Sequence, residues 1–237
     1  MKNVFTFLLL LFSLLCNGQS PKLFTTDKEL SSSLINQIYQ DRNGFIWIAT
    51  EDGLNRYDGA KFTIYKHEPN NEHSLAHNFV RTVFEDSKGH LLIGTYIGIQ
   101  MYDPATDNFT PLAKLEDTGE TLESNINSFI ERKNGEIWVS GNVLCKLDIK
   151  DHLLTVRKVD IAVTSPGSLF EDKKQNVWMA KGEEGVYQLT PDNQLTLHLS
   201  KDNGYVKSIC EDQRGNIYVG SIRKGLFIYD KERKTFV

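Results

Sequence analysis

The sequence predicts an all-β fold, a β-propeller built of four-stranded antiparallel blades, and three observations carry this prediction. One sequence pattern recurs five times with a period of about 43 residues, the spacing typical of propeller blades. Each copy divides into short apolar runs separated by Gly, Asn and Asp, as strands and their turns do. No segment of the repeats is long and periodic enough to predict a helix.

The composition fits one folded body without a nucleic-acid partner. The 237 residues are 40% hydrophobic and 24% charged, which provides enough apolar side chain for a sizeable core. Lys and Arg number 27 against 31 Asp and Glu. The resulting net charge of −4 gives no field that would attract DNA, RNA or an anionic membrane.

The first element, residues 1–18, is predicted to be a secretory signal peptide. A basic residue precedes an apolar stretch over residues 4–15, which is too short to span a bilayer as a permanent helix. Small side chains at Cys16 and Gly18 suit cleavage after Gly18, whereas lipid attachment at Cys16 would require a small residue in place of Leu15. We therefore expect export to the periplasm or another extracytoplasmic compartment, with no further membrane insertion.

The remaining chain is expected to divide into an N-terminal segment, residues 19–33, with an outer strand at 22–25, and propeller repeats over residues 34–237. The blades are predicted approximately at residues 34–66, 78–112, 124–157, 165–199 and 205–237. Outer strands number six against five sets of inner strands, so the first outer strand lacks its partners. We expect an N-terminal fragment, an open and incomplete part of a larger seven-bladed propeller. A five-bladed ring that closes on itself, with a loose N-terminal stretch, is the alternative.

Within each repeat, a strand leads into a tight turn that begins at an acidic residue and closes on glycine. In the first copy these are Asp41, which caps the turn amides, and Gly44, which takes a positive φ. The corresponding first residues of the later turns are Asp86, Arg132, Asp172 and Asp212. They follow one another at steps of 45, 46, 40 and 40 residues. Because Gln175 replaces the fourth glycine and the third copy is shortened at Gly141, blades 3 and 4 are expected to be the least regular.

A bulky residue follows six positions after the start of each turn. These residues are Trp47, Leu92, Trp138, Trp178 and Tyr218. They are expected to fill the space between neighbouring blades, because each sheet of a propeller must bury both faces.

Two cysteines, Cys145 and Cys210, remain after the predicted cleavage. They belong to the third and fifth copies, so we expect their Cα atoms to be too far apart for a disulfide. Cys210 aligns with apolar positions of the other repeats and is therefore predicted to be a small residue of the core.

The repeats resemble the two-component regulator propeller family. Residues 40–58, QDRNGFIWIATEDGLNRYD, are the closest copy of its pattern, and the resemblance covers residues 34–237. It implies a non-catalytic extracytoplasmic sensor region of a hybrid two-component histidine kinase, one that senses oligosaccharides derived from polysaccharides. The implied partners are an oligosaccharide, the rest of the parent kinase and a second copy in a homodimer. The sequence itself holds no membrane helix, kinase, receiver or DNA-binding segment. A secreted propeller enzyme acting on polysaccharide, or a protein-interaction scaffold, are the alternatives.

Candidate sites are few, and the sequence predicts no catalytic residues, no metal site and no cofactor. The acidic doublets Glu85-Asp86, Glu171-Asp172 and Glu211-Asp212 occupy the same turn of different blades and are predicted to cap turns rather than to form a glycosidase pair.

Histidines and polar segments give two weaker hypotheses. His73 and His77, beside Glu72, have the spacing of helical zinc ligands, but the preceding Pro69 leaves little room for a helix. Polar segments that enter the inner strands are expected near the channel mouth, where they would bind a sugar or cap turns. They are residues 33–36, 75–78 and 123–127. The ligand-binding residues stay unassigned.

Overall fold

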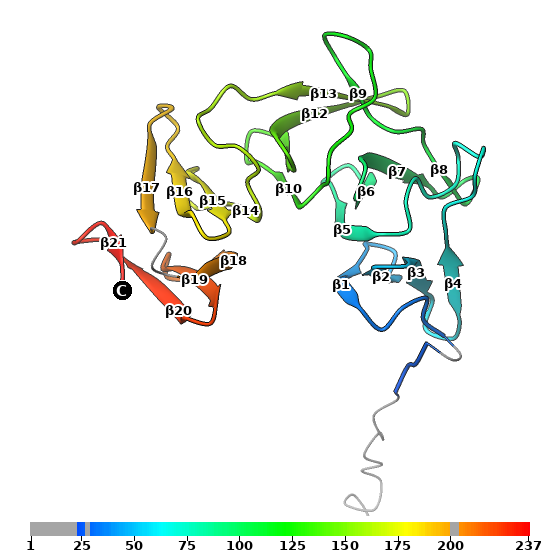
Figure 1. Ribbon diagram of the computed structural model, residues 1–237, viewed down its shortest axis with the longest axis horizontal. Coiled ribbons are helices and arrows are strands. Elements are labelled where there is room, and N and C mark those ends of the chain that lie inside the picture. Colours follow the sequence, from blue (N-terminus) through cyan, green and yellow to red (C-terminus); the bar gives the residue numbers. More distant parts are fainter. Residues whose placement is uncertain (1–22, 27–28, 200–203) are drawn as a thin grey trace, which may run out of the picture.

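The protein, seen here in a computed structural model that describes residues 23–26, 29–199 and 204–237, consists of five β-sheets (Figure 1). Within these ranges all the regular elements are strands, and no helix has the length and apolar character to cross a membrane. The predicted signal peptide, residues 1–18, lies outside the described residues.

In each sheet four strands pair antiparallel in chain order. Blade 1 contains β1 (Ile35–Gln40), β2 (Ile46–Thr50), β3 (Gly53–Tyr57) and β4 (Phe62–Tyr65). Blade 2 contains β5 (Val80–Glu85), β6 (Leu91–Thr95), β7 (Ile99–Asp103) and β8 (Asn108–Phe109). Blade 3 contains β10 (Ser128–Glu131), β11 (Ile137–Ser140), β12 (Leu144–Lys150) and β13 (Leu153–Lys158). Blade 4 contains β14 (Leu169–Glu171), β15 (Val177–Lys181), β16 (Gly185–Leu189) and β17 (Leu195–Leu199). Blade 5 contains β18 (Tyr205–Glu211), β19 (Ile217–Ile222), β20 (Gly225–Asp230) and β21 (Thr235–Phe236).

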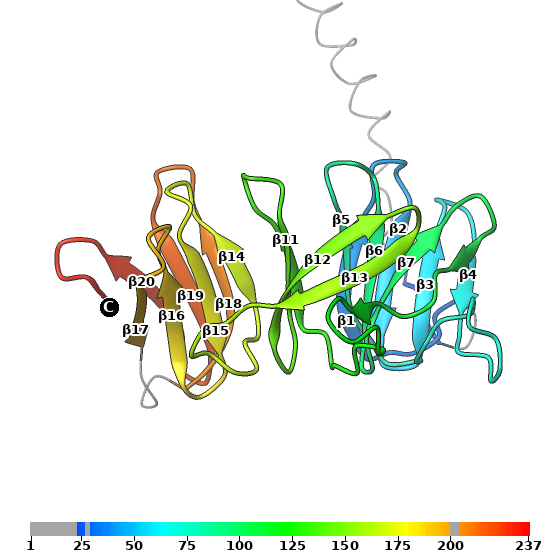
Figure 2. The same ribbon diagram turned by 90° about the horizontal axis from the view of Figure 1, so that it is seen from above.

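The five blades fan out around one axis, with β1, β5, β10, β14 and β18 nearest to it (Figure 1). Figure 2, turned by 90°, shows the blades standing side by side, with most strands upright and with β12 and β13 running obliquely. The arc is open between blade 1 and blade 5. The propeller prediction is therefore confirmed, and the alternative of a closed five-bladed ring is wrong for the described blades.

Apolar clusters fill the four spaces between consecutive blades. The bulky residue of the second strand packs into the space toward the next blade, as predicted. Trp47, Leu92, Trp138 and Trp178 are all buried there. Tyr218 in blade 5 is only half-buried, because no described blade follows it.

Exposure at the two ends of the arc shows how much each blade depends on its neighbours. Ile38 of blade 1 is 62% exposed, whereas its counterpart Val83 in blade 2 is 1% exposed. At the other end Leu226 is 64% exposed and its counterpart Leu54 is fully buried. Cys210 is also exposed, so its predicted burial in the core is wrong for the same reason.

Cys145, by contrast, is buried in the core between blades 2 and 3. Burial raises the pKa of its thiol to about 11, so this cysteine stays protonated at neutral pH. Both cysteines are free thiols.

The two residues of each acidic doublet have different roles. Oδ1 of Asp41 accepts the N–H groups of Asn43 and Phe45 at 2.9 and 3.0 Å, which confirms its role as a turn cap. The glutamate before the aspartate does not cap its own turn, and the prediction is wrong for it. Instead Glu85 accepts the N–H of Arg42 in the preceding blade at 2.8 Å.

The same bond recurs at each junction of the arc. Glu131, Glu171 and Glu211 accept the main-chain N–H groups of Ser87, Lys133 and Lys173 at 2.7, 2.7 and 3.0 Å. One carboxylate per junction thus fixes the position of each blade against the one before it.

Blade 3 departs from four strands because a fifth, β9 (Lys114–Leu115), pairs parallel with the outer edge of β13. Blade 2 is predicted to extend to residue 112, but its outer strand ends at Phe109. Pro111 follows and has no N–H for a sheet, so regular strand pairing stops there. The N–H of Ala113 still donates to the carbonyl of Ile99 in β7 at 2.9 Å, and the chain then pairs with blade 3.

The outer strand predicted at 22–25 is not formed within its described residues, 23–25. Phe24 packs there against the rings of Tyr57 and Phe62, with centroids 5.2 and 5.0 Å away. The segment contacts the outer part of blade 1 through a side chain rather than through strand pairing.

Candidate functional site

A polar hollow of about 490 Å³ lies at the axis, between the inner strands. All five blades contribute to its wall. The contributing residues of the inner strands and their approaches are Asn36, Gln37, Arg81, Thr82, Asn127, Ser128, Gly167, Ser168, Lys207 and Ser208. Because the arc is open, the hollow is accessible from the gap between blades 1 and 5.

These ten residues are two consecutive positions of the repeat, the fifth and fourth before the start of the turn. Two neighbours on a regular strand would point to opposite faces of the sheet. The pairing register slips at Asn36 in β1, at Arg81 in β5 and at Lys207 in β18, each of which is a β-bulge. A bulge re-aims a side chain, and it brings both positions to the axis in three of the blades.

Several of the lining side chains also tie one blade to the next. Asn36 donates to the carbonyl of Val80 at 2.8 Å, and Gln37 accepts the N–H of Val83 at 2.7 Å. Asn127 accepts from Arg81 at 3.2 Å. The wall is thus held in place by its own hydrogen bonds, which keeps its polar groups preorganised.

The polar segments predicted near the channel mouth are only partly in this wall. Asn36 and Asn127 line the hollow. Asn78 of the segment 75–78 instead bonds Asp52 at 3.1 Å and the N–H of His67 at 2.8 Å. It therefore acts as a connection between loops.

Arg81 and Lys207 are functional candidates that the sequence analysis did not single out. The signal was present in the repeat register, since their position holds Asn, Arg, Asn, Gly and Lys in the five copies. A position that varies while its neighbours stay similar is free of a common packing role.

The lining residues provide amides, hydroxyls and two cations, and none of them is a carboxylate or a histidine. A glycosidase would require two carboxyl groups facing each other across the scissile bond. The hollow can bind a polar ligand, but its described wall holds no acid and base pair for chemistry of that kind.

His73 and His77 do not converge. Nδ1 of His73 lies 3.1 Å from the carbonyl of Phe109, while Nδ1 of His77 accepts the N–H of Phe79 at 2.9 Å. In the described part of the chain, no three His, Cys, Asp or Glu side chains are grouped to hold a metal ion.

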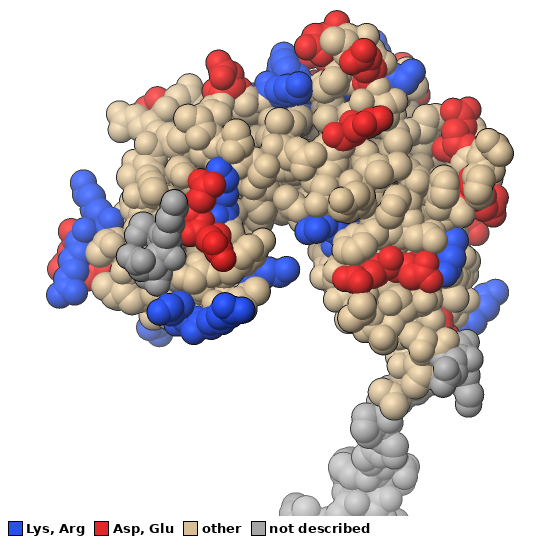
Figure 3. All heavy atoms as spheres, in the orientation of Figure 1, with Lys and Arg blue, Asp and Glu red and all other residues tan. Residues whose placement is uncertain are grey.

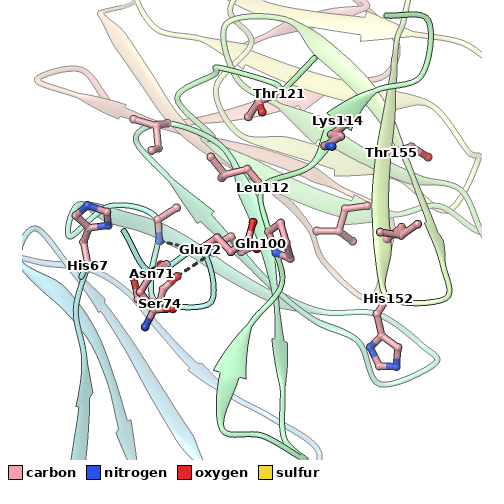
Figure 4. A pocket seen from close by; sticks show the side chains of 15 residues that line it. His67, Asn71, Glu72, Ser74, Gln100, Leu112, Lys114, Thr121, His152 and Thr155 are labelled. Atoms are coloured by element: carbon pink, nitrogen blue, oxygen red, sulfur yellow. Dashed lines mark hydrogen bonds between the residues drawn. The ribbon is translucent and has the colours of Figure 1, made fainter. Parts of the chain in front are cut away.

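A larger hollow of about 660 Å³ lies away from the axis, beside Gln100 of β7 (Figure 4). Gln100 is 1% exposed and its amide nitrogen donates to the carbonyls of Ser74 and Thr110 at 3.0 and 2.8 Å. Its amide oxygen accepts the N–H of Ala76 at 2.6 Å. These bonds hold the surrounding loops together, which gives Gln100 a structural role. We place the functional site at the axis instead, because all five blades contribute to the wall of the axial hollow.

The sequence model of the two component regulator propeller family matches three stretches, residues 29–52, 74–96 and 200–223. They belong to blades 1, 2 and 5. These three stretches carry two-component regulator propeller repeats. Blades 3 and 4, where Arg132 and Gln175 depart from the repeat pattern, are not among the matched stretches.

Proteins similar to this chain include a histidine kinase and the extracellular domains of two component systems. Histidine kinase P4 of Formosa agariphila is 37% identical over 83 residues, which are 32% of this chain and 6% of the kinase. The extracellular domain of a hybrid two component system from B. thetaiotaomicron superposes with a TM-score of 0.77 at 22% identity, over 91% of this chain and 31% of that domain. A second such domain from the same organism gives 0.74 at 18% identity, over 93% and 33%.

An enzyme shares the architecture as well. Virginiamycin B lyase from Staphylococcus aureus has a TM-score of 0.65 at 13% identity, over 92% of this chain and 72% of the lyase. Structural likeness at these identities shows the propeller fold alone. The chain spans about a third of the length of the two extracellular domains.

Proposed function

We propose that these propeller repeats are the ligand-binding part of an extracytoplasmic two-component sensor, that they perform no catalysis, and that they bind an oligosaccharide in the axial hollow. The observation that carries the proposal is the wall of this hollow, in which two equivalent positions of every blade meet around one axis. The kinase relative and the extracellular domains of similar fold support the same assignment.

The chemistry of the wall suits a sugar. Its amides and hydroxyls offer both donors and acceptors to the hydroxyl groups of a carbohydrate. Tyr205, which also lines the hollow, is 48% exposed and presents an aromatic ring to the ligand. The volume lies within the range of about 300–1,000 Å³ that small-ligand sites occupy.

Signalling follows if the ligand favours one arrangement of the sensor over another. A sugar bound at the axis would touch several blades and so favour one width of the open arc. In the parent kinase such a preference would be passed to the membrane and to a homodimer.

Calorimetric titration of the purified chain with a panel of neutral and acidic oligosaccharides tests the proposal. We expect saturable binding of at least one sugar, lost in Asn36→Trp, which fills the hollow, and retained in Asn43→Trp, an exposed turn residue. Binding that survives Asn36→Trp would place the site elsewhere. Release of shorter glycans during incubation would show an enzyme, and capture of a periplasmic protein without sugar binding would show a scaffold.

A further inference from the structure

We infer that the ligand of the axial hollow is an anionic oligosaccharide, whose carboxylate or sulfate group is held by Arg81 and Lys207. The inference rests on the proposed function, because it names the ligand class of the same site. Its first support is the charge of the wall, which holds these two cations and no carboxylate among its described residues.

One carboxylate on each of two neighbouring turns has a cationic partner. Asp52, between β2 and β3, pairs with Lys66 at 2.6 Å. Glu184, between β15 and β16, pairs with Lys181 at 2.8 Å. Figure 3 shows both cationic and acidic side chains on the two sides of the opening between blades 1 and 5. These two carboxylates are therefore already paired with cations outside the hollow.

Arg81 stands out among the half-buried arginines. Arg56 and Arg132 each pair with a carboxylate, Asp107 and Glu171, both at 2.9 Å. Arg81 has no ion-pair partner among the described residues, and its Nε is buried without any hydrogen bond. Leaving a guanidinium partly desolvated and unpaired is costly, so the site favours a ligand that brings the missing negative charge.

The guanidinium of Arg81 is nevertheless held in position. Its Nη1 donates to Asn127 at 3.2 Å, and its central carbon lies 5.4 Å from the centre of the Phe79 ring. A planar guanidinium fixed in this way can bind a carboxylate or sulfate through two parallel hydrogen bonds.

An aromatic surface extends from this cation. The ring of Tyr96 is 53% exposed and lies 6.1 Å from Phe79 and 5.6 Å from His77, measured between ring centres. A sugar ring can pack on this surface while its acidic group reaches Arg81. Lys207, exposed on the bulge of β18, approaches the same hollow from blade 5.

Three probes test the inference by calorimetry with the purified chain. They are tetragalacturonate, which carries carboxylates, a carrageenan tetrasaccharide, which carries sulfates, and galactotetraose, which is neutral. We expect at least one acidic probe to bind tenfold or more tightly than galactotetraose, with an affinity that falls as salt rises. Whichever acidic probe binds identifies the group.

Binding measurements on variants test whether Arg81 and Lys207 hold the acidic group. Arg81→Gln and Lys207→Gln are each expected to weaken the acidic probe tenfold or more, and Arg81→Lys by less, because the charge remains without the planar fork. Lys88→Gln, an exposed cation outside the hollow, serves as the matched control and should change nothing. If Arg81→Gln fails to fold, the exposed Lys207 decides the test.

Failures of the two proposals differ. Binding of galactotetraose as tight as that of the acidic probes, unchanged in both Gln variants, would overturn the anionic ligand and leave the sensor proposal standing. Absence of binding by any of the three probes and by the wider panel would overturn both.

Discussion

Glu136 accepts the indole N–H of Trp138 at 3.0 Å, from only two residues away. In blades 1 and 4 the corresponding indoles donate to an aspartate six residues earlier, at 2.7 and 2.8 Å. The third repeat has Arg132 in the place of that aspartate, and its guanidinium carbon lies 4.6 Å from the centre of the Trp138 ring. A carboxylate at a new position thus restores the bond, while the arginine covers the ring.

Glu136→Gln should therefore destabilise the protein at neutral pH but not in acid. Partial burial favours the neutral acid, but bonds from Lys146 and Trp138 outweigh it and lower the pKa of Glu136 to about 2. A lowered folded-state pKa gives stability that is present above the unfolded value of about 4.3 and lost as pH falls toward 2.

The expected difference in unfolding free energy between wild type and Glu136→Gln is about 1 kcal/mol at pH 7, since the partly exposed ion pair is weakened by solvent. Urea unfolding of both proteins between pH 7 and pH 3 measures it. The gap should shrink below pH 4. A gap that stays constant over this range would mean that the charge of Glu136 contributes nothing.

The carboxylates at the blade junctions should contribute more to the unfolding free energy than Glu136 does. Glu171 has a side chain only 7% exposed, and it binds both the N–H of Lys133 and the guanidinium of Arg132. Glu171→Ala leaves the N–H of Lys133 without its acceptor and takes from Arg132 its nearer carboxylate, while Glu136 remains 3.6 Å from the guanidinium. We therefore expect a loss of about 1–3 kcal/mol in unfolding free energy.

Gln40 supplies the matched control. It occupies the same position of the repeat in blade 1, where no described blade precedes it, and it is exposed. Gln40→Ala should change the unfolding free energy by less than about 0.5 kcal/mol. Equal losses in the two variants would show that the position matters within its own blade and not at the junction.

The repeat pattern predicted the propeller and the residues between its blades because both depend on local periodicity. Trp47 and Trp178 are buried where the register places them. Cys210 could not be assigned in this way, since its exposure depends on whether a further blade covers it. Likewise, no local signal marks β9 as a partner of β13, because the pairing is set by where the chain after Pro111 finds a free edge.

The axial site was predictable only in part. The sequence placed polar residues such as Asn36 and Asn127 near the axis, but the bulges at Arg81 and Lys207 follow from the pairing of strands. Without a bulge, alternation along the strand would send one of two adjacent side chains away from the axis. The repeat register, combined with the bulge, is what identifies the wall.

Gly94 of β6 should tolerate no side chain. A Cβ there would lie 2.6 Å from Thr82 Cγ2 and 2.7 Å from Ile126 Cγ2, and both neighbours are β-branched and stiff. We expect Gly94→Ala to lower the unfolding free energy by about 1–3 kcal/mol. Thr82→Ser removes one of the two obstructing methyl groups, so the double variant should recover part of the loss in urea titrations.

The equivalent glycine of blade 5 provides a comparison. A Cβ at Gly220 would meet only the hydroxyl of Ser208 within 3 Å, and that hydroxyl can rotate away. Gly220→Ala should therefore cost less than about 1 kcal/mol in the same titration. A loss as large as that of Gly94→Ala would argue that the small residue is required by the strand itself rather than by its neighbours.

Gln175→Gly should stabilise the protein. Gln175 adopts φ of 67° in the turn where Gly44 has 89°, a left-handed conformation that costs a residue with a Cβ about 1–2 kcal/mol. Its main chain bonds Asp172 and Arg132, and both bonds persist with glycine. Glycine also raises the conformational entropy of the unfolded chain, which offsets part of this relief. We therefore expect a net gain of about 0.5–1 kcal/mol in unfolding free energy. Thermal unfolding measures it, and Gln175→Ala, which keeps the Cβ, should show no gain; equal gains in both would assign the effect to the side chain.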